Sequence, residues 1–497
     1  MARRGRSDPS GVLMCGFPEA AAPTRFRGNV LRARTLRSPL AVVWLALALV
    51  AAGCGSEPES NLRASGETPS SGDSAAAGMT DSRPEVSAET SPGSERSADA
   101  PARASELPAT SDTSAGASGE GVPASGSARA AASDRPRPVR PDSIRGIYLN
   151  AWRAGSRSRV DAALDLVRRT EINTLVVDVK DATGYMSYAT DVPLAGVIGA
   201  DDEIRIRDLP ARLDRLADEG IYPIARIVVF KDPLLAERRP EMAVQDSTGA
   251  PWVDGKGDRW VNPWDRRIWE YHLEIAREAV ALGFPEIQWD YIRFPDRPAS
   301  EMEQARFPGA EGRAKSEAVR GFLIYTREGL ADLDVPVTAD VFGVATAART
   351  DVGIGQLWED MTDVTDALLP MVYPSHYWRG SYGFEVPNAH PYEVVRRALE
   401  DGIRRNREVE DPAEIIPWLQ DFTLGDPPYG VPEVRAQILA VEDLGIPHWI
   451  LWNASGRYTE GALRPIDGWG PGGEPAIRFG GGVVPASDRR RSPVVDH

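Results

Sequence analysis

Eight short apolar segments, each suited to a buried β-strand, recur along the chain after residue 143 and alternate with longer amphipathic segments. This alternation is typical of a parallel sheet covered by helices. Eight strand–helix units predict a closed (β/α)8 TIM barrel, in the α/β class. An open, doubly wound sheet is the alternative, but no Gly-x-Gly-x-x-Gly motif follows the first strand. The predicted strands span residues 144–150, 174–180, 222–230, 286–294, 336–343, 367–375, 414–422 and 448–455.

The first 54 residues are predicted to be a signal peptide that directs export. The apolar run from Leu40 to Ala52 is too short to span a membrane comfortably, and it leads into Ala-Ala-Gly-Cys. This ending resembles a bacterial lipobox, although Ala51 stands where Leu is preferred. We therefore expect Cys54 to be lipidated and to anchor the protein to a membrane of the cell envelope. An ordinary secretory signal, which would release the protein, or a short membrane anchor is the alternative.

Residues 55–140 are rich in Ser, Ala, Gly, Pro and Glu and nearly lack large apolar residues. Such a segment buries too little apolar surface to offset the conformational entropy lost on folding. We predict a disordered tether between the lipidated cysteine and the barrel. The barrel is predicted over residues 141–470, and residues 471–497 are predicted to form a loose tail.

The net charge and the metal-binding residue types argue against several functions. The net charge of −16 disfavours a nucleic-acid partner, because such binding usually requires a basic surface. The two cysteines, Cys15 and Cys54, both precede the predicted barrel, and the five histidines include no His-x-His or HExxH pair. We therefore expect neither a metal site nor a cofactor in the barrel.

Charged, polar and aromatic residues gather at the carboxyl ends of the predicted strands, where the active sites of (β/α)8 enzymes lie. Such residues are costly to bury unpaired. In strand order they are Asn150, Trp152 and Arg153; Asp178, Lys180 and Asp181; Arg226, Lys231 and Asp232; Asp290, Tyr291 and Arg293; Asp340; Tyr373, Ser375, His376 and Tyr377; Trp418, Gln420 and Asp421; and Trp452 and Asn453.

Each of these charges also has a purely structural interpretation. Asp290 would pair with Arg293 or with a neighbouring strand, and Asp340 would cap the turn that follows it. Asp178 and Lys180, two residues apart, would form a local pair. The convergence of several acids, Trp and Tyr residues on one barrel mouth favours a functional site instead.

The residue types at this mouth suit sugar chemistry. Two carboxyl groups cleave a glycosidic bond, one as an acid and one as a nucleophile or base, and no metal is needed. Asp290 and Asp340 lie on neighbouring strands, which are about 4.8 Å apart. We therefore expect their carboxyl groups near the separation of about 5–5.5 Å that marks retaining enzymes.

Seven motifs occur in order along the predicted barrel: RGIYLNAW, NTLVVDVKDATG, IQWDYIRFP, VTADVFG, LPMVYPSHY, PWLQDF and WILWNASG. Over about residues 144–456 they resemble the putative glycoside hydrolase domain family (domain of unknown function 4015), a family of α-amylase-like barrels. The resemblance implies that Asp290 stands where such enzymes place a nucleophile and that Asp340 is its partner acid. The fifth-strand acid is Glu in α-amylases and Asp here. Asp421 is a second candidate for the partner carboxylate.

The leading hypothesis is a metal-independent, retaining glycoside hydrolase that acts on a cell-envelope or extracellular polysaccharide or oligosaccharide. A non-catalytic carbohydrate-binding or scaffold lipoprotein is the alternative. A Schiff-base lyase that uses Lys180 is disfavoured, because the neighbouring acids would keep this lysine protonated. The residues predicted to bind substrate are Asp178, Lys180, Asp181, Tyr291, Arg293, Tyr373, His376, Trp418, Asp421 and Trp452.

Overall fold

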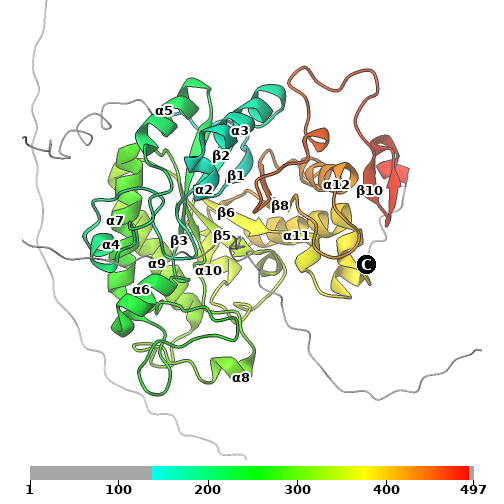
Figure 1. Cartoon of the computed structure of the whole chain (residues 1–497). Coiled ribbons are helices and arrows are strands. Elements are labelled where there is room, and N and C mark those ends of the chain that lie inside the picture. Colours follow the sequence, from blue (N-terminus) through cyan, green and yellow to red (C-terminus); the bar gives the residue numbers. More distant parts are fainter. Residues whose placement is uncertain (1–136, 492–497) are drawn as a thin grey trace, which may run out of the picture. The chain divides into compact units, whose positions relative to one another are not determined.

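Parallel strands close into a barrel in the computed structural model, which describes residues 137–491 (Figure 1). The pairing runs from β1 to β6 in sequence order, continues through β8 and β9, and returns to β1. The predicted (β/α)8 barrel is therefore confirmed. The strands are β1 Arg145–Leu149, β2 Thr174–Lys180, β3 Tyr222–Val228, β4 Ile287–Asp290, β5 Val337–Phe342, β6 Ala367–Met371, β7 Glu414–Ile415, β8 Trp418–Gln420 and β9 Trp449–Trp452.

Strands β7 and β8 share the seventh position of the barrel. β7 pairs with the start of β6, whereas β8 pairs with the end of β6 and with β9. Pro417 lies between them and has no N–H to donate to a neighbouring strand. Its carbonyl nevertheless accepts the N–H of Ile450 at 2.9 Å. The predicted strand 414–422 is thus interrupted at this proline, and its two parts remain in the barrel wall.

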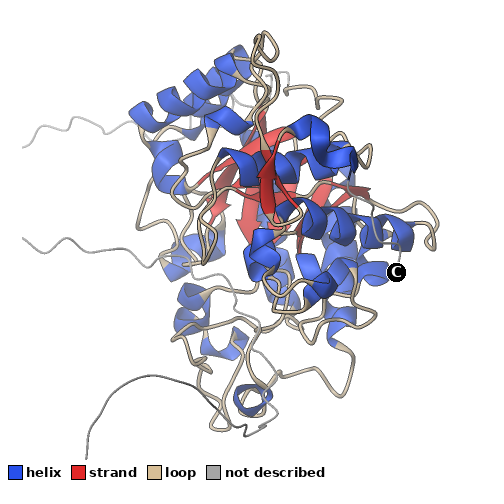
Figure 2. Ribbon diagram, turned by 90° about the vertical axis from the view of Figure 1, so that its right-hand side faces the viewer, coloured by secondary structure: helices blue, strands red, loops and turns tan. Residues whose placement is uncertain are grey.

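Helices surround the strands, as Figure 2 shows. Helix α7 illustrates why these segments are helical: its buried residues include Ile268, Ile275 and Ala279, which share one face at helical spacing. It begins after Asp265, whose carboxylate accepts the N–H of Arg267 at 3.0 Å. The helices are α2 Ala151–Gly155, α3 Arg157–Arg169, α4 Pro193–Ile198, α5 Leu209–Asp218, α6 Pro233–Arg238, α7 Arg266–Leu282, α8 Ala299–Met302, α9 Lys315–Leu330, α10 Trp358–Thr362, α11 Pro391–Asn406 and α12 Val431–Glu442.

Alternate residues of each strand point into the barrel or out toward the helices. In β4, Trp289 points outward, because its ring packs against Phe322 of α9 with the ring centroids 5.1 Å apart. Gln288 and Asp290 point inward, where they bond side chains of neighbouring strands. Because side chains alternate between the two faces of a strand, the polar residues of this buried strand all point into the barrel interior.

Part of the predicted loose tail is folded. Strands β10 Ile477–Phe479 and β11 Gly482–Val484 form an antiparallel hairpin. β10 contacts α11 and α12, and Phe479 packs edge-on against Tyr392 with ring centroids 5.2 Å apart. The prediction missed this hairpin because glycines and charged residues outnumber the few apolar side chains that attach it to the barrel.

The predicted signal peptide, Cys54 and the tether up to residue 136 lie outside the described residues. Residues 137–140, the end of the predicted tether, are described and contact the barrel. Arg137 Nη1 donates to the carbonyl of Leu333 at 2.6 Å, and Arg140 Nη2 bonds Glu414 Oε2 at 2.6 Å. The chain is therefore attached to the barrel four residues before the predicted boundary.

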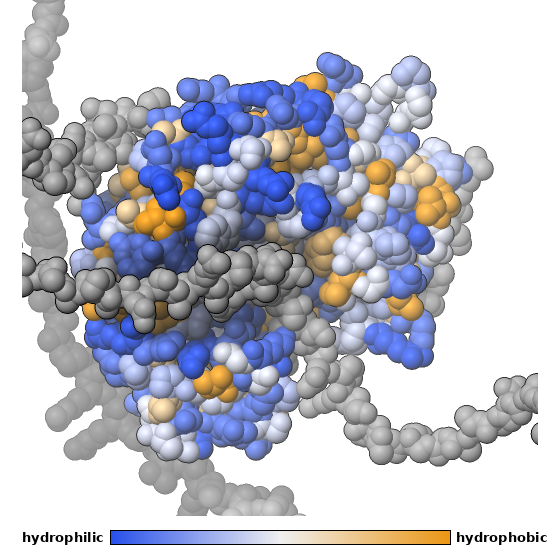
Figure 3. All heavy atoms as spheres, in the orientation of Figure 1, coloured by the Kyte–Doolittle hydropathy of each residue, from blue (hydrophilic) through white to orange (hydrophobic). Residues whose placement is uncertain are grey.

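The described surface visible in Figure 3 is mostly hydrophilic, with apolar side chains in separate patches. The exposed large apolar side chains include Trp152 and Trp378, which are 64% and 41% exposed. Within residues 137–491, no helix is both long enough and apolar enough to cross a membrane.

Candidate active site

Four charged side chains from neighbouring strands lie inside the carboxyl end of the barrel. They are Asp178 of β2, Arg226 of β3, Asp290 of β4 and Asp340 of β5, and we call them the carboxyl-end cluster. Each is at most 4% exposed. Arg226 lies between two acids: its Nη1 donates to Asp178 Oδ1 at 2.5 Å and its Nε donates to Asp290 Oδ2 at 2.9 Å. Its Nη2 bonds the same oxygen of Asp290.

Arg226 stays charged in this buried position. Burial alone would lower its pKa, but Asp290 and Asp178 more than offset that effect and raise this pKa well above its ordinary value. Three carboxyl groups thus surround one guanidinium. Because a buried excess of negative charge is unfavourable, we expect one of the three acids to keep its proton.

The surroundings of Asp340 favour its protonated form. Burial, and then the negative charge of Asp290, raise the pKa of Asp340 well above its ordinary value, while Arg226 opposes them. Its Oδ1 accepts from Trp418 Nε1 at 2.7 Å and from Gln288 Nε2 at 2.8 Å, and its Oδ2 lies 2.9 Å from the same amide nitrogen. Asp340 is therefore a buried carboxyl group that two N–H donors hold in place, beside a carboxylate that is bound to arginine.

Asp178 closes the other side of the cluster. Its Oδ2 accepts the hydroxyl of Tyr148 at 2.5 Å. Burial raises the pKa of Asp178, and the positive charge of Arg226 opposes this rise. Asp178 thus shares Arg226 with Asp290.

Within residues 137–491, no group of three or more His, Cys, Asp or Glu side chains is placed to hold a metal ion.

A left-handed residue ends β4 directly after Asp290. Tyr291 has φ +52°, a conformation that is uncommon for residues other than glycine. Its N–H donates to Asp290 Oδ1 at 2.5 Å, so the turn also holds the carboxylate. The predicted strand 286–294 was too long because the apolar residues 292 and 294 follow this turn and do not continue the ladder. Strained backbone of this kind is common at functional sites.

Aromatic rings lie beside the carboxyl-end cluster. Tyr148 and Trp452 are stacked with their ring centroids 4.1 Å apart, and Trp418 meets Trp452 edge-on at 5.4 Å. Arg226 lies over Trp452 at 5.2 Å from the ring centroid. Trp452 is half-buried, whereas Trp418 is 1% exposed. Trp418 therefore orients Asp340, and Trp452 offers a partly open face.

A family model described as "Putative glycosyl hydrolase domain" matches residues 146–458. The chain belongs to this family. The match covers every strand of the barrel apart from the first residue of β1. Family membership supports a general glycosidase-like function for this glycosyl hydrolase domain and is consistent with a carbohydrate substrate.

Several solved structures are similar to the glycosyl hydrolase domain, whereas no curated protein matches it. A hypothetical protein from Ruminiclostridium thermocellum is 40% identical, with 39% of this chain and 97% of that chain covered and a TM-score of 0.36. The PgaB (BpsB) glycoside hydrolase domain from Bordetella bronchiseptica is 13% identical, with 63% and 94% covered and a TM-score of 0.47. The α-galactosidase TtGalA from Thermus thermophilus is 13% identical, with 66% and 61% covered and a TM-score of 0.38.

Two other predicted substrate-binding residues form a separate aromatic group in the glycosyl hydrolase domain. Tyr373 and His376, which follow β6, pack against Phe422 after β8, with ring centroids 5.6 and 6.0 Å from it. His376 Nδ1 lies 3.0 Å from Ser375 Oγ. Burial lowers the pKa of His376 to about 4, so its ring is neutral. This group offers neutral hydrogen-bonding atoms rather than charge.

Lys180 does not join the carboxyl-end cluster. The register of β2 shifts between Asp178 and Lys180, and Lys180 Nζ pairs with Asp232 at 2.7 Å and donates to the carbonyl of Val228 at 2.9 Å. Lys180 is fully buried there. The local pair between Asp178 and Lys180 that the spacing of two suggested is therefore wrong, because this shift separates the two side chains.

Asp181 and Asp421 also have partners outside the cluster. Asp181 Oδ2 accepts from Arg205 Nη1 at 2.9 Å, and its Oδ1 accepts the N–H of Thr183 at 2.9 Å. Asp421 bonds Thr459 through both oxygens, at 2.6 Å to the hydroxyl and 2.8 Å to the N–H. Burial raises the pKa of Asp421 to about 6. Asp421 thus holds the loop after β9, whereas the hydrogen bonds of Arg226 go to Asp178 and Asp290.

Arg293 is not the partner of Asp290, because Arg226 occupies that role. Arg226 was predicted at a strand end but without a function, and neither Gln288 nor Tyr148 was predicted as a site residue. The signal for Gln288 was present: Glu286, Gln288 and Asp290 are polar at every second position of an otherwise apolar strand. A period of two places all three on one face.

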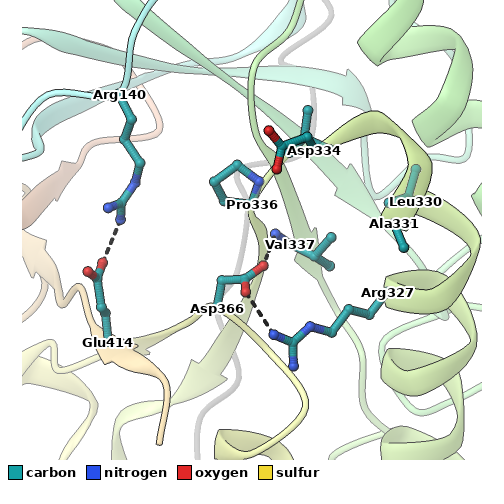
Figure 4. A pocket seen from close by; sticks show the side chains of 10 residues that line it. Arg140, Arg327, Leu330, Ala331, Asp334, Pro336, Val337, Asp366 and Glu414 are labelled. Carbon is teal, nitrogen blue, oxygen red and sulfur yellow. Dashed lines mark hydrogen bonds and ion pairs between the residues drawn. The ribbon is translucent and has the colours of Figure 1, made fainter. Parts of the chain in front are cut away.

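A pocket of about 500 Å³ lies at the opposite, amino end of the barrel (Figure 4). Its lining residues include Val337, the first residue of β5, and Asp366, which precedes β6. Asp366 accepts from Arg327 at 3.0 Å and from the N–H of Val337 at 2.7 Å, and Arg140 bonds Glu414 at 2.6 Å. Because the active sites of (β/α)8 enzymes lie at the opposite, carboxyl end of the barrel, we propose no catalytic role for this pocket.

Proposed function

We propose that this glycosyl hydrolase domain cleaves glycosidic bonds with Asp340 as the general acid and Asp290 as the nucleophile. The division of charge between the two acids carries the proposal. Asp340 has a raised pKa and neutral hydrogen-bond donors, whereas Asp290 is bound to the Arg226 guanidinium. Enzymes that cleave glycosides need this pairing of a protonated and an ionised carboxyl group.

The reaction proceeds in two balanced steps. The Asp290 carboxylate attacks the anomeric carbon and forms a carbon–oxygen bond, while the glycosidic bond breaks and Asp340 gives its proton to the leaving oxygen. Water then attacks the same carbon, Asp340 takes a proton from it, and the bond to Asp290 breaks. Two displacements retain the anomeric configuration.

The strand register supports the retaining pathway. Trp289 of β4 pairs with Ala339 of β5, so Asp290 and Asp340 occupy equivalent positions one residue later. Neighbouring strands are about 4.8 Å apart, which is close to the carboxyl separation of about 5–5.5 Å in retaining enzymes. The half-buried ring of Trp452 would supply an apolar face for the sugar.

We further propose that the substrate is a polysaccharide or oligosaccharide of the cell envelope or its surroundings, and that Cys54 carries a lipid anchor. The sequence LALALVAAGC supports this location. In a bacterial host, labelled palmitate should enter the wild-type chain and not Cys54→Ser. Equal labelling of both chains would contradict the anchor.

Hydrolysis of a broad panel of defined oligosaccharides by the purified full chain tests the activity. We expect cleavage of at least one linkage, and NMR spectra of the first product should show the same anomeric configuration as the substrate. The Asp290→Asn, Asp340→Asn double variant is the blank. Wild-type protein that releases no more sugar than this blank would overturn the proposal, and an inverted product would overturn the retaining pathway alone.

A further inference from the structure

Arg293 differs from the other buried arginines of the described chain. Five arginines are less than one-tenth exposed, and four of them bond a carboxylate. These four are Arg205 with Asp181 at 2.9 Å, Arg226 with Asp178 at 2.5 Å, Arg405 with Glu359 at 2.6 Å and Arg435 with Glu442 at 2.8 Å. Arg293 is 5% exposed, and no carboxylate of residues 137–491 lies within ion-pair distance of it.

The guanidinium of Arg293 is surrounded by aromatic rings instead. Its Cζ lies 5.0 Å from the ring centroid of Trp260, 4.8 Å from that of Tyr291 and 4.6 Å from that of Phe342. Cation–π contacts of this kind stabilise a buried positive charge without neutralising it. Its one hydrogen bond to a described residue runs from Nη1 to the carbonyl of Phe294 at 3.2 Å. A guanidinium has five N–H donors, so most remain for a ligand.

This cation is built on the two strands that carry the candidate catalytic acids. Tyr291 and Arg293 follow Asp290 at the end of β4, and Phe342 is the last residue of β5, two residues beyond Asp340. Residues two apart in a strand point to the same side, so Phe342 lies one level nearer the barrel mouth than Asp340. A sugar bound between the two acids would therefore have Arg293 beside it.

The surrounding charges leave Arg293 uncompensated at close range. Asp296 interacts with it electrostatically from beyond ion-pair distance; burial raises the pKa of Asp296, and Arg293 opposes that rise. Lys231 is a second cation near the ring of Tyr291, with its Nζ 5.6 Å from the ring centroid. Lys231 also pairs with Asp258 at 2.8 Å. Within residues 137–491, Arg293 therefore has an acid at longer range and a second cation nearby, but no acid in direct contact.

From this arrangement we infer that the substrate is an acidic saccharide and that Arg293 binds a carboxylate on the sugar held at Asp290 and Asp340. The inference rests on the proposed function and adds its substrate class. A planar carboxylate matches the paired N–H groups of a guanidinium, and burial between aromatic rings strengthens the bond by excluding water. Sugars whose ring carries a carboxylate, such as uronic acids, have this chemistry.

Matched pairs of substrates test the inference. Short oligogalacturonides and alginate oligosaccharides are compared with the same oligosaccharides after chemical reduction of their carboxylates to alcohols. Calorimetry with the full chain gives the dissociation constant of each, and product analysis gives its turnover. We expect the wild type to bind the charged member of a pair about tenfold to hundredfold more tightly, which corresponds to one charge-assisted pair of hydrogen bonds. Sulfated carrageenan oligosaccharides serve as a different anion.

Two variants separate recognition from folding. Arg293→Gln should reduce the ratio of the two dissociation constants to about one, whereas Arg293→Lys, which keeps the charge inside the rings, should retain part of the preference. Arg266→Gln is the matched control, because Arg266 is exposed and lies over Trp269 of α7 at 4.0 Å, on the outside of the barrel. This control should keep the wild-type ratio.

Each outcome decides between the two proposals. A preference for carboxylates that depends on Arg293 supports the inference, even if no member of the panel is cleaved and the proposed function fails. Equal binding of charged and reduced partners by the wild type, binding of no acidic saccharide, or an equal preference in Arg293→Gln would overturn the inference. Tighter binding of sulfated than of carboxylated oligosaccharides would overturn the carboxylate assignment. Cleavage of neutral glycans alone would support the proposed function and overturn the acidic substrate.

Discussion

The two ends of the barrel both contain a buried acid beside an arginine, and the two acids are the last residue of β4 and the residue that precedes this strand. At the carboxyl end, Asp290 bonds Arg226. At the amino end, Glu286 lies just before β4, where Oε2 accepts the hydroxyl of Tyr222 at 3.0 Å and lies 3.4 Å from Arg140 Nε. Together with Glu414, which Arg140 also bonds, we call Arg140, Tyr222 and Glu286 the amino-end cluster.

The two clusters differ in how their charge is compensated. Arg226 is a strand residue and its side chain is 5% exposed, whereas Arg140 belongs to the segment that leads into the barrel and its side chain is 29% exposed. Glu286 is fully buried, and its Oε1 has no hydrogen-bond partner among the described residues. Active sites of (β/α)8 enzymes lie at the carboxyl end, while the amino end contributes stability. We therefore place the proposed chemistry at the carboxyl end alone.

Removing the two candidate catalytic acids should have the largest effect on activity. We expect Asp290→Asn to lower kcat about 10⁴-fold or more, because the nucleophile is lost. Asp340→Asn should lower it about 10²- to 10⁴-fold on natural glycosides, because no acid protonates the leaving oxygen. On aryl glycosides, whose leaving groups depart without a proton, Asp340→Asn should recover most activity and Asp290→Asn should not. Steady-state kinetics on both substrate types measure this split.

Asp421→Asn is the matched control for these variants. Both of its oxygens bond Thr459, so the change should loosen the loop after β9 and leave the leaving-group dependence unaltered. If Asp421→Asn, rather than Asp340→Asn, were the variant rescued by a good leaving group, Asp421 would be the acid. The assignment of Asp340 would then be wrong.

The same substitution at the two arginines should give unequal losses of stability. Arg226→Met leaves Asp178 and Asp290 buried without their cation, which should lower the free energy of unfolding by about 3–5 kcal/mol. Arg140→Met removes a partly exposed partner that solvent screens, so we expect a loss of about 1 kcal/mol or less. Urea denaturation near neutral pH measures both values. Equal losses would contradict the difference in compensation between the two ends.

The sequence predicted the barrel and the strand ends well, because both follow from local patterns. Strands with near-continuous apolar residues require cover on both faces, and the carboxyl ends of parallel strands share one side of the barrel. Asp178, Asp290 and Asp340 could therefore be predicted to lie together. Their common partner Arg226 could not be assigned from the sequence. The pairing of inward-pointing side chains depends on the stagger between neighbouring strands.

Two local deviations from regular strands caused the other errors. The register shift after Asp178 turns Lys180 away from the barrel interior, and the left-handed Tyr291 ends β4 before its apolar residues run out. Neither the register shift nor the left-handed turn has a glycine or proline at its position, so no residue type in the sequence indicates these deviations. The aromatic cage of Arg293 was beyond prediction for another reason: Trp260, Tyr291 and Phe342 come from three separate segments.

The amino-end cluster should make stability depend on pH without affecting the chemistry at the other end. Burial raises the pKa of Glu286 from 4.5 to about 7, against the opposing effects of Arg140 and Tyr222. Between these two pH values the unfolded chain has released the proton while the folded chain holds it. The free energy of unfolding therefore falls as the pH rises through this window, by about 3 kcal/mol for this group.

Glu286→Gln removes this proton and its pH dependence. Relative to the wild type, the variant should become more stable by about 3 kcal/mol as the pH rises from 4.5 to 8, and the difference between the two chains isolates Glu286 from other groups, such as Asp421, that titrate in the same range. Urea denaturation at several pH values measures it. Because Glu286 lies at the far end of β4 from Asp290, the pH dependence of kcat should not change. If the free energies of unfolding of the wild type and of Glu286→Gln changed in parallel with pH, the contribution assigned to Glu286 would be wrong. A shifted pH profile of kcat would show that the two ends of the barrel are coupled.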